Sequence, residues 1–309
     1  MCSWTKLAVL VAVGFNGAAV FGQQAAPTAA GRSYRALAPG VLKSVEPGRQ
    51  LRESFSRHDI VELLAVNPTF DWAKDRSFRH DVWTLEFRFK PMRMVWVDVP
   101  RPGGYMEPKR VWYMVYCVTN RAIEEKTLDP NDPEPPPKYG WLHPVEAADG
   151  TFKIQCLNGP IRFVPEFLLE SPEFNTVQPD RFVPVAMGMP GAPGPIWKRE
   201  DPNRRFFNTT EISQGRIAVG KTAWGIVMWD NVNPQVDRFS VYVKGLTNAY
   251  KWQDQPGEYK KGARPGSYRR LLQKTLKLNF WRPGDEYDEN EREIRYGIPG
   301  EVDYEWVYR

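Results

Sequence analysis

The sequence predicts an all-β protein, built as one or two immunoglobulin-like β-sandwich domains with long Pro/Gly-rich loops. Short runs rich in aromatic and β-branched residues recur along the chain, and such residues favour strands. Clusters drawn from the 28 Pro and 24 Gly separate these runs and mark turns and loops. The apolar spacing of a helix is almost absent after residue 66, so we expect few helices.

The first 22 residues have the order of parts that is typical of a secretory signal peptide. Lys6 supplies a positive charge, and Leu7 begins an apolar run. Val20 and Gly22 then occupy the small-residue positions of a cleavage site, which predicts a mature chain that starts at Gln23. The alternative is a membrane anchor, but a span needs about 20 predominantly apolar residues, and this run is shorter. We therefore expect export to the periplasm or the medium, with no membrane span after cleavage.

Composition divides the rest of the chain into three parts. Residues 23–48 are rich in Ala, Gly and Pro without a period, which predicts a flexible spacer. We expect a first β-sandwich domain at 49–195 and a second β-rich domain at 196–309, with the boundary in a Gly/Pro-rich stretch near residue 195. The length also suits one large domain, so both organisations stay open.

The strongest strand signal is at 110–119, which is apolar on both faces and predicts a central strand. Residues 82–89 alternate large apolar and polar side chains, the pattern of a half-buried strand. Five prolines within 129–140 predict an extended surface loop. Further strands are expected at 92–99, 152–157, 161–169, 216–219, 224–229, 239–246, 275–281 and 304–308.

Charge is distributed unevenly along the second half. Residues 251–282 carry nine Lys/Arg against two acids, and 283–305 carry nine acids against two Arg. Opposite charges on adjacent strands pair favourably, so we expect these segments to neutralise each other. The formal net charge of +5 is too small to imply nucleic-acid binding by itself, and no nucleic-acid partner is predicted.

Cleavage of the leader leaves two cysteines, Cys117 and Cys156. In an oxidising compartment they can form a disulfide that closes a loop of about 40 residues, worth roughly 3–4 kcal/mol. The alternative is two buried thiols, because cysteine is among the most buried residue types. The sequence leaves both alternatives, the disulfide and the two buried thiols, open.

The stretch from Gly215 to Thr222 fits the phosphate-loop pattern GxxxxGK[ST]. That loop works when a buried strand precedes it and a helix follows, because the backbone N–H groups then face the phosphates. Here a polar stretch precedes and a strand-like stretch follows. We predict a β-hairpin with its turn near Gly220, and no nucleotide as a ligand.

No other pattern indicates catalysis, a metal or a cofactor. The histidines His58, His80 and His143 lack the spacing of metal ligands, and no GxSxG elbow occurs. The acidic run at 285–291 lacks the spacing of an EF-hand, so a solvated turn is the preferred interpretation. Carboxylate pairs for glycoside hydrolysis cannot be picked from sequence, since their separation is a property of the fold.

Twelve tryptophans are the most suggestive remaining feature. Most should pack in the core, but an exposed Trp on a β-sandwich can stack on sugars through its apolar face. Trp141 and Trp252, in loop-like and turn-rich surroundings, are the candidates for glycan stacking.

Several motifs resemble those of known secreted proteins. The strand that ends in Val118-Thr119-Asn120, followed by Phe163-Val164-Pro165-Glu166-Phe167, resembles the immunoglobulin-like modules of bacterial extracytoplasmic proteins. The motifs FDWAK, LEFRFKP, VWYMVYCVTN, KGLTN and the C-terminal stretch from KLNFWRP are similar to a group of secreted proteins of planctomycete-type bacteria. The resemblance implies export and a β-sandwich, and it implies no activity.

These observations favour an exported, non-enzymatic envelope or surface protein that acts as a structural or protein-interaction module. A glycan-binding module is the first alternative, and a secreted hydrolase that uses carboxylates is the second. The expected partners are accordingly envelope proteins or glycans.

Overall fold

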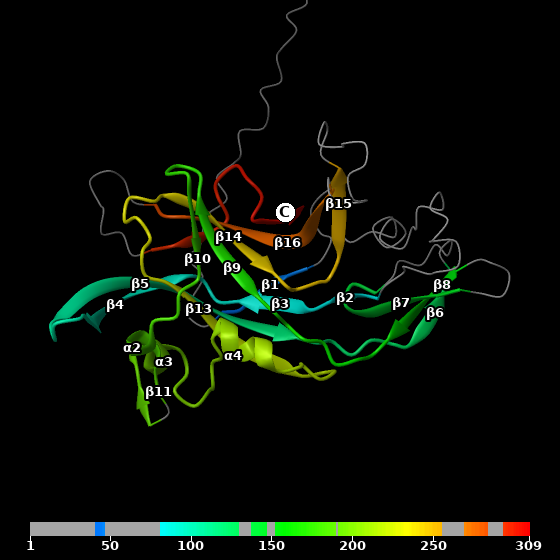
Figure 1. Ribbon diagram of the computed structural model, residues 1–309, viewed down its shortest axis with the longest axis horizontal. Coiled ribbons are helices and arrows are strands. Elements are labelled where there is room, and N and C mark those ends of the chain that lie inside the picture. Colours follow the sequence, from blue (N-terminus) through cyan, green and yellow to red (C-terminus); the bar gives the residue numbers. More distant parts are fainter. Residues whose placement is uncertain are drawn as a thin grey trace, which may run out of the picture. The chain divides into compact units, whose positions relative to one another are not determined.

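Most of the described chain is β-structure (Figure 1), which confirms the predicted all-β class. The computed structural model describes residues 41–46, 81–129, 137–146, 152–189, 191–254, 269–283 and 293–309. Within these ranges the strands form antiparallel sheets of five, seven, four and two strands. The leader, most of the spacer and the acidic run lie outside the described residues, and the immunoglobulin-like type of sandwich stays a prediction.

Two of the sheets face each other across the main core. The five-stranded sheet has the order β1 (Lys43–Val45), β3 (Glu86–Phe89), β5 (Met106–Thr119) and β13 (Thr222–Trp229), and β4 (Arg93–Pro100) also pairs with β5. The seven-stranded sheet has the order β10 (Thr176–Pro179), β9 (Glu166–Ser171), β14 (Arg238–Lys244), β16 (Arg269–Trp281) and β15 (Tyr250–Asp254), with β17 (Arg295–Tyr296) and β18 (Tyr304–Tyr308) also on β16.

A smaller sheet and a helical segment complete the described structure. The four-stranded sheet has the order β2 (Val82–Thr84), β7 (Gly140–Glu146), β8 (Phe152–Leu157) and β6 (Lys126–Leu128). The helical segment contains α2 (Pro184–Met187), the hairpin of β11 (Gly188–Met189) and β12 (Ala192–Pro193), α3 (Pro195–Glu200) and α4 (Thr209–Gln214). None of the described helices is long and apolar enough to span a bilayer.

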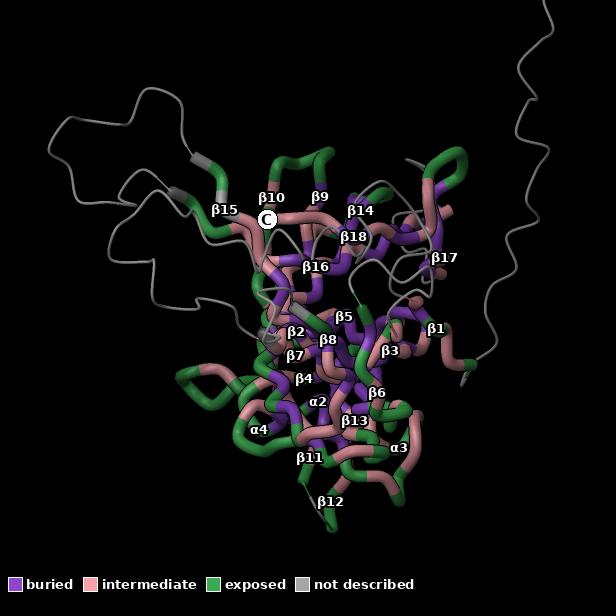
Figure 2. The backbone as a smooth tube through the Cα atoms, turned by 90° about the vertical axis from the view of Figure 1, so that its right-hand side faces the viewer, coloured by how far each residue is buried: buried purple, intermediate pink, exposed green. Residues whose placement is uncertain are grey.

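Strand β5 is the central strand that its two apolar faces predicted, and Figure 2 shows it among the buried segments. Trp112 and Tyr116 point into the inner core between the two sheets, where Phe239 packs against Trp112. Tyr113 and Val115 point the other way, into an outer core closed by α2, α3 and neighbouring residues. Both faces of β5 are therefore covered from Val111 to Thr119.

The segment predicted as one strand at 82–89 is two strands in two different sheets. Leu85 is buried between them, and its N–H donates to the carbonyl of Leu246 at 2.8 Å. After β3 the chain bulges, because three residues from Lys90 stand opposite two on β5 before pairing resumes at Arg93. Pro91 lacks an N–H and fits this unpaired position.

Both large sheets contain strands from either side of residue 195. Strand β13 pairs with β5 along its whole length, from Thr222 opposite Thr119 to Trp229 opposite Trp112. Strand β14 pairs with β9 in the other sheet. Opposite charges also meet as expected at one point, where Lys277 of β16 bonds to Glu305 of β18 at 2.6 Å.

Candidate binding surfaces

The two cysteines lie in different sheets. Cys117 belongs to β5 and Cys156 to β8, and although both are buried, neither takes part in a disulfide. Cys156 packs with Leu128, Leu142 and Ile154 in the core of the four-stranded sheet, whereas Cys117 lies between β3 and β13. The structure therefore shows the buried-thiol alternative in place of the bridge, because the two side chains belong to separate packing environments.

The two tryptophans proposed for sugar stacking lie in strands. Trp141 is in β7 opposite Trp83, is half-buried, and packs against the inner core. A Cβ at Gly159 would lie 3.1 Å from the Trp141 ring, so the glycine lets the ring lie close to the backbone. The expected loop setting of Trp141 is thus wrong, because strand pairing holds it in a sheet. Trp252 is in β15 opposite Leu271, and glycan binding by either residue stays a prediction.

The stretch from Gly215 to Thr222 has the opposite context from a phosphate loop. Helix α4 precedes it and β13 follows it, whereas a phosphate loop needs the strand first. Gly220 has a φ of +72°, and the N–H of Lys221 donates to the carbonyl of Ala218 at 3.0 Å. The turn near Gly220 is present, but the predicted β-hairpin is not, because Ile217 bridges Ile161 and β13 pairs with β5.

Charged side chains line the outer face of the five-stranded sheet, on the side of α2 and α3. We call this set the basic row. Glu86 and Arg88 begin it because they alternate with Phe87 and Phe89, which point into the inner core. Its five cations outnumber its three carboxylates by two, and its members are Glu86, Arg88, Lys90, Arg93, Arg121, Glu200, Asp201 and Arg204.

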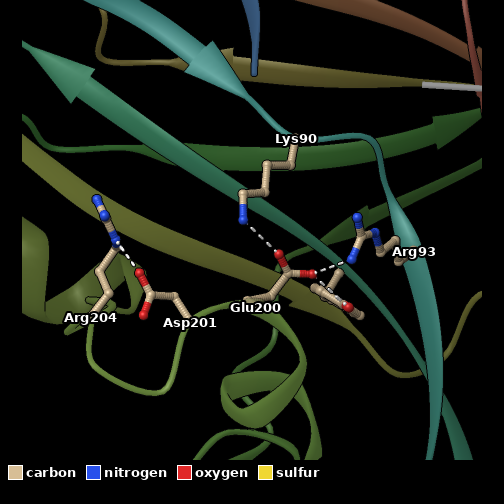
Figure 3. Close-up of polar contacts among 6 residues, drawn as sticks. Lys90, Arg93, Glu200, Asp201 and Arg204 are labelled. Carbon is tan, nitrogen blue, oxygen red and sulfur yellow. Dashed lines mark hydrogen bonds and ion pairs between the residues drawn. The ribbon is translucent and has the colours of Figure 1, made fainter. Parts of the chain in front are cut away.

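A buried cluster around Glu200 forms one part of the basic row (Figure 3). The Glu200 carboxylate, 2% exposed, contacts Lys90 Nζ at 2.9 Å and Arg93 Nη1 at 2.9 Å. The Tyr113 hydroxyl donates to Glu200 Oε1, also at 2.9 Å. Burial and the nearby Glu200 raise the pKa of Tyr113, so the hydroxyl keeps its proton and remains a donor. Both oxygens of Glu200 are engaged, and the cluster fastens the end of α3 to β4 and β5.

Beside Glu200, Asp201 pairs with Arg204 at 3.0 Å in a more exposed position. The hydrogen bond from Arg204 lowers the pKa of Asp201. The guanidinium of Arg204 also lies over the ring of Trp224, 4.1 Å from its centroid, and Trp224 is the β13 residue opposite Cys117. Arg204 thus connects the Glu200 cluster to the part of the row that lies near Cys117.

A pocket of about 410 Å³ opens at the Glu86 end of the row. The Glu86 carboxylate accepts from Arg121 Nε at 2.9 Å and from Arg121 Nη2 at 2.8 Å, a bidentate ion pair. The hydroxyls of Thr119 and Thr222 lie 2.8 Å apart across β5 and β13. The pocket lining consists of Glu86, Arg88, Thr119, Arg121, Ala122 and Gly220.

Arg88 differs from the other cations of the row. No described carboxylate lies within ion-pair distance of it, and its Nε is buried without a hydrogen-bond partner among the described residues. Its guanidinium lies against the Cys117 thiol. Burial raises the pKa of this thiol, and Arg88 opposes the shift. The sequence analysis did not single out Arg88, although it is a charged residue in the alternating segment 82–89.

The β4–β5 hairpin, at the left of Figure 1, carries exposed apolar side chains. Trp96, Tyr105 and Met106 are 50%, 62% and 55% exposed. Trp96 stands opposite Arg110, whose guanidinium lies 5.0 Å from the centre of the indole ring. We call these four residues the hairpin patch. Gly103 supplies the positive φ that the connecting turn requires.

One described carboxyl, that of Asp180, has a raised pKa, and burial is the main cause. It accepts a hydrogen bond from Thr209 at 2.5 Å. Glu166 also raises the pKa of Asp180, but Glu166 itself pairs with Lys244 at 3.0 Å. Among the residues that the structure describes, no group of three or more His, Cys, Asp and Glu side chains is placed to hold a metal.

The fold and these surfaces define a protein of two facing antiparallel sheets with a basic outer face and an exposed aromatic hairpin. Comparison with protein families, curated proteins and solved structures finds no match to the chain.

Proposed function

We propose that this chain is an exported, non-enzymatic envelope or surface protein that acts as an interaction module and contacts a protein partner through the hairpin patch. The observation that carries the proposal is the half-exposed Trp96 with Arg110 against its ring. Trp, Tyr and Arg dominate the binding energy of protein interfaces, and the patch contains all three. The pattern of the first 22 residues supports export.

A photo-crosslinking amino acid at Tyr105 tests the proposal in cells that make the protein. We expect one discrete cross-linked protein from this position, and its loss when Trp96→Ala is added. The control is the same group at Leu271, which is 68% exposed on the other large sheet. Equal products from both positions, or no product from Tyr105, would overturn the proposal.

Glycan binding is the second candidate, because Trp96 also presents an aromatic surface of the kind that stacks on sugars. A glycan array screened with the mature chain and with Trp96→Ala separates the two functions. Sugar binding that is lost with Trp96 would favour this candidate over the protein partner. Loss with Trp141→Ala instead would favour sugar binding at one of the two tryptophans expected from the sequence.

Export has its own test, independent of any ligand. N-terminal sequencing of the protein recovered from the periplasm or the medium should begin at Gln23. A protein that is recovered only from the cytoplasm, with residues 1–22 intact, would contradict the export part of the proposal.

A further inference from the structure

The pocket at the end of the basic row contains an arginine that pairs with no carboxylate among the described residues. Each carboxylate of the row forms an ion pair with a cation other than Arg88. Glu86 pairs with Arg121, Asp201 with Arg204, and Glu200 with Lys90 and Arg93. Arg88 remains, with a buried Nε that bonds to no described atom. A buried donor without a partner costs free energy, and a charged donor costs more than a neutral one.

The surroundings of Arg88 suit an acceptor from outside the chain. Arg121 uses Nε and Nη2 on Glu86 and is 55% exposed, so its remaining N–H groups are available at the rim of the pocket. Two guanidinium groups against one carboxylate give the lining a charge of +1. Guanidinium groups bind carboxylates and phosphates in a bidentate manner, which matches planar or tetrahedral oxyanions.

The volume of the pocket indicates the size of the molecule that carries the anionic group. Its volume of about 410 Å³ lies within the range of small-molecule sites, about 300–1,000 Å³, and exceeds what one small ion fills. The Thr119 hydroxyl adds a neutral polar group to the lining. A charged group on a molecule the size of a sugar would use both the arginines and this hydroxyl.

We propose that the pocket of Glu86, Arg88 and Arg121 binds an oxyanion, with Arg88 as the principal donor. The ligand class is a carboxylate or sulfate group, either as a free ion or carried on a sugar. The site is separate from the hairpin patch, and neither proposal depends on the other.

Calorimetric titration of the mature chain at low ionic strength tests the site, with glucuronate, glucose, acetate and inorganic sulfate as probes. We expect saturable binding of glucuronate and none of glucose, because the neutral sugar lacks the charge. Tighter binding of glucuronate than of acetate and sulfate would identify a sugar acid as the ligand. Equal binding of all three anions would support the oxyanion site and identify the free ion as its ligand.

Three variants connect the binding to the named residues. Arg88→Gln should weaken binding at least tenfold. Arg181→Gln, which removes an arginine paired with Asp230 just beyond the end of β13, should leave it within twofold. Glu86→Gln should tighten binding several-fold, because it removes the competing carboxylate and releases Arg121.

The sign of the Glu86→Gln effect distinguishes a binding site from a merely structural cluster, since general loss of structure weakens binding. Circular dichroism confirms that each variant is folded. The proposal fails if no anion binds saturably, if Arg88→Gln binds as tightly as the unmodified chain, or if folded Glu86→Gln binds more weakly.

Discussion

The Tyr113 hydroxyl donates to Glu200 Oε1 at 2.9 Å, and this contact joins the middle of β5 to the end of α3. The same carboxylate binds Lys90 and Arg93, so three donors converge on one buried anion. Removing one partner of a buried ion pair leaves an uncompensated charge. The stability of the outer core should therefore depend strongly on Glu200.

Glu200→Gln should lower the free energy of unfolding by about 3–5 kcal/mol, because Lys90 and Arg93 would remain buried without an anion. Urea unfolding followed by tryptophan fluorescence measures the change. Asp201→Asn is the matched control, since Asp201 is the next residue but pairs with Arg204 in a more exposed position. The control should shift the urea midpoint only slightly, and an equal shift in both variants would contradict the argument.

Two tyrosines of β5 should respond differently to loss of the hydroxyl. Tyr113 and Tyr116 are both buried, but only the Tyr113 hydroxyl has a hydrogen-bond partner among the described residues. Tyr113→Phe should lower the free energy of unfolding by about 1.5–3 kcal/mol, because it removes a bond to a charged group. Tyr116→Phe should leave it unchanged or raise it by up to about 1–3 kcal/mol, because it removes an unsatisfied buried hydroxyl.

Urea unfolding of both phenylalanine variants, under the conditions used for Glu200→Gln, provides the comparison. A destabilised Tyr116→Phe protein would show that this hydroxyl has a partner, and a neutral Tyr113→Phe protein would show that its bond to Glu200 contributes nothing.

Local strand signals in the sequence predicted much of the fold, and non-local pairing accounts for the rest. The central position of β5 followed from its two apolar faces, which require cover on both sides. The split at Leu85 did not follow, because alternation continues across it while the pairing partner changes from β7 to β5. Pairing of β13 with β5 joins residues more than a hundred positions apart. The alternation of apolar and polar residues within a strand cannot specify which distant strand it pairs with.

The candidate binding surfaces were harder to predict than the strands. Arg88 was visible as a charged residue in an alternating strand, but its lack of a counter-charge depends on where Glu86, Glu200 and Asp201 bind. Trp96 was one of twelve tryptophans, and the sequence alone does not distinguish the exposed ones from the buried ones. Trp141 was expected in a loop because prolines precede it, but its pairing with Trp83 places it in a strand.

The two cysteines should be unreactive thiols in the folded protein. Burial raises the pKa of the Cys117 thiol, so little thiolate is present at neutral pH, and the thiolate is the nucleophile. A disulfide reagent that releases a coloured thiolate should detect neither Cys117 nor Cys156 in the native mature chain, and both in strong denaturant. A reducing agent should leave the urea midpoint unchanged, and a lower midpoint under reduction would instead indicate a bridge.

Asp180 should destabilise the protein as the pH rises. Its pKa is raised from 3.8 in the folded state, mainly by burial, so the folded carboxyl holds a proton that the unfolded chain has already released. Stability associated with Asp180 is therefore present below about pH 3.8 and is lost as the pH rises through the folded-state pKa. Asp180→Asn keeps an acceptor for the Thr209 hydroxyl but cannot ionise. The variant should gain stability over the unmodified chain across this window.

Urea unfolding of Asp180→Asn and the unmodified chain from pH 3.5 to pH 8 measures this difference. Asp201→Asn provides a control of opposite sign, because the hydrogen bond from Arg204 lowers the pKa of Asp201. Its stabilising contribution is present above about pH 3.8 and is lost as the pH falls through the lowered folded-state pKa, so Asp201→Asn should lose stability relative to the unmodified chain as the pH rises. If Asp180→Asn followed the same trend as Asp201→Asn, burial would not be the dominant influence on Asp180, and its bond to Thr209 would stabilise the charged form instead.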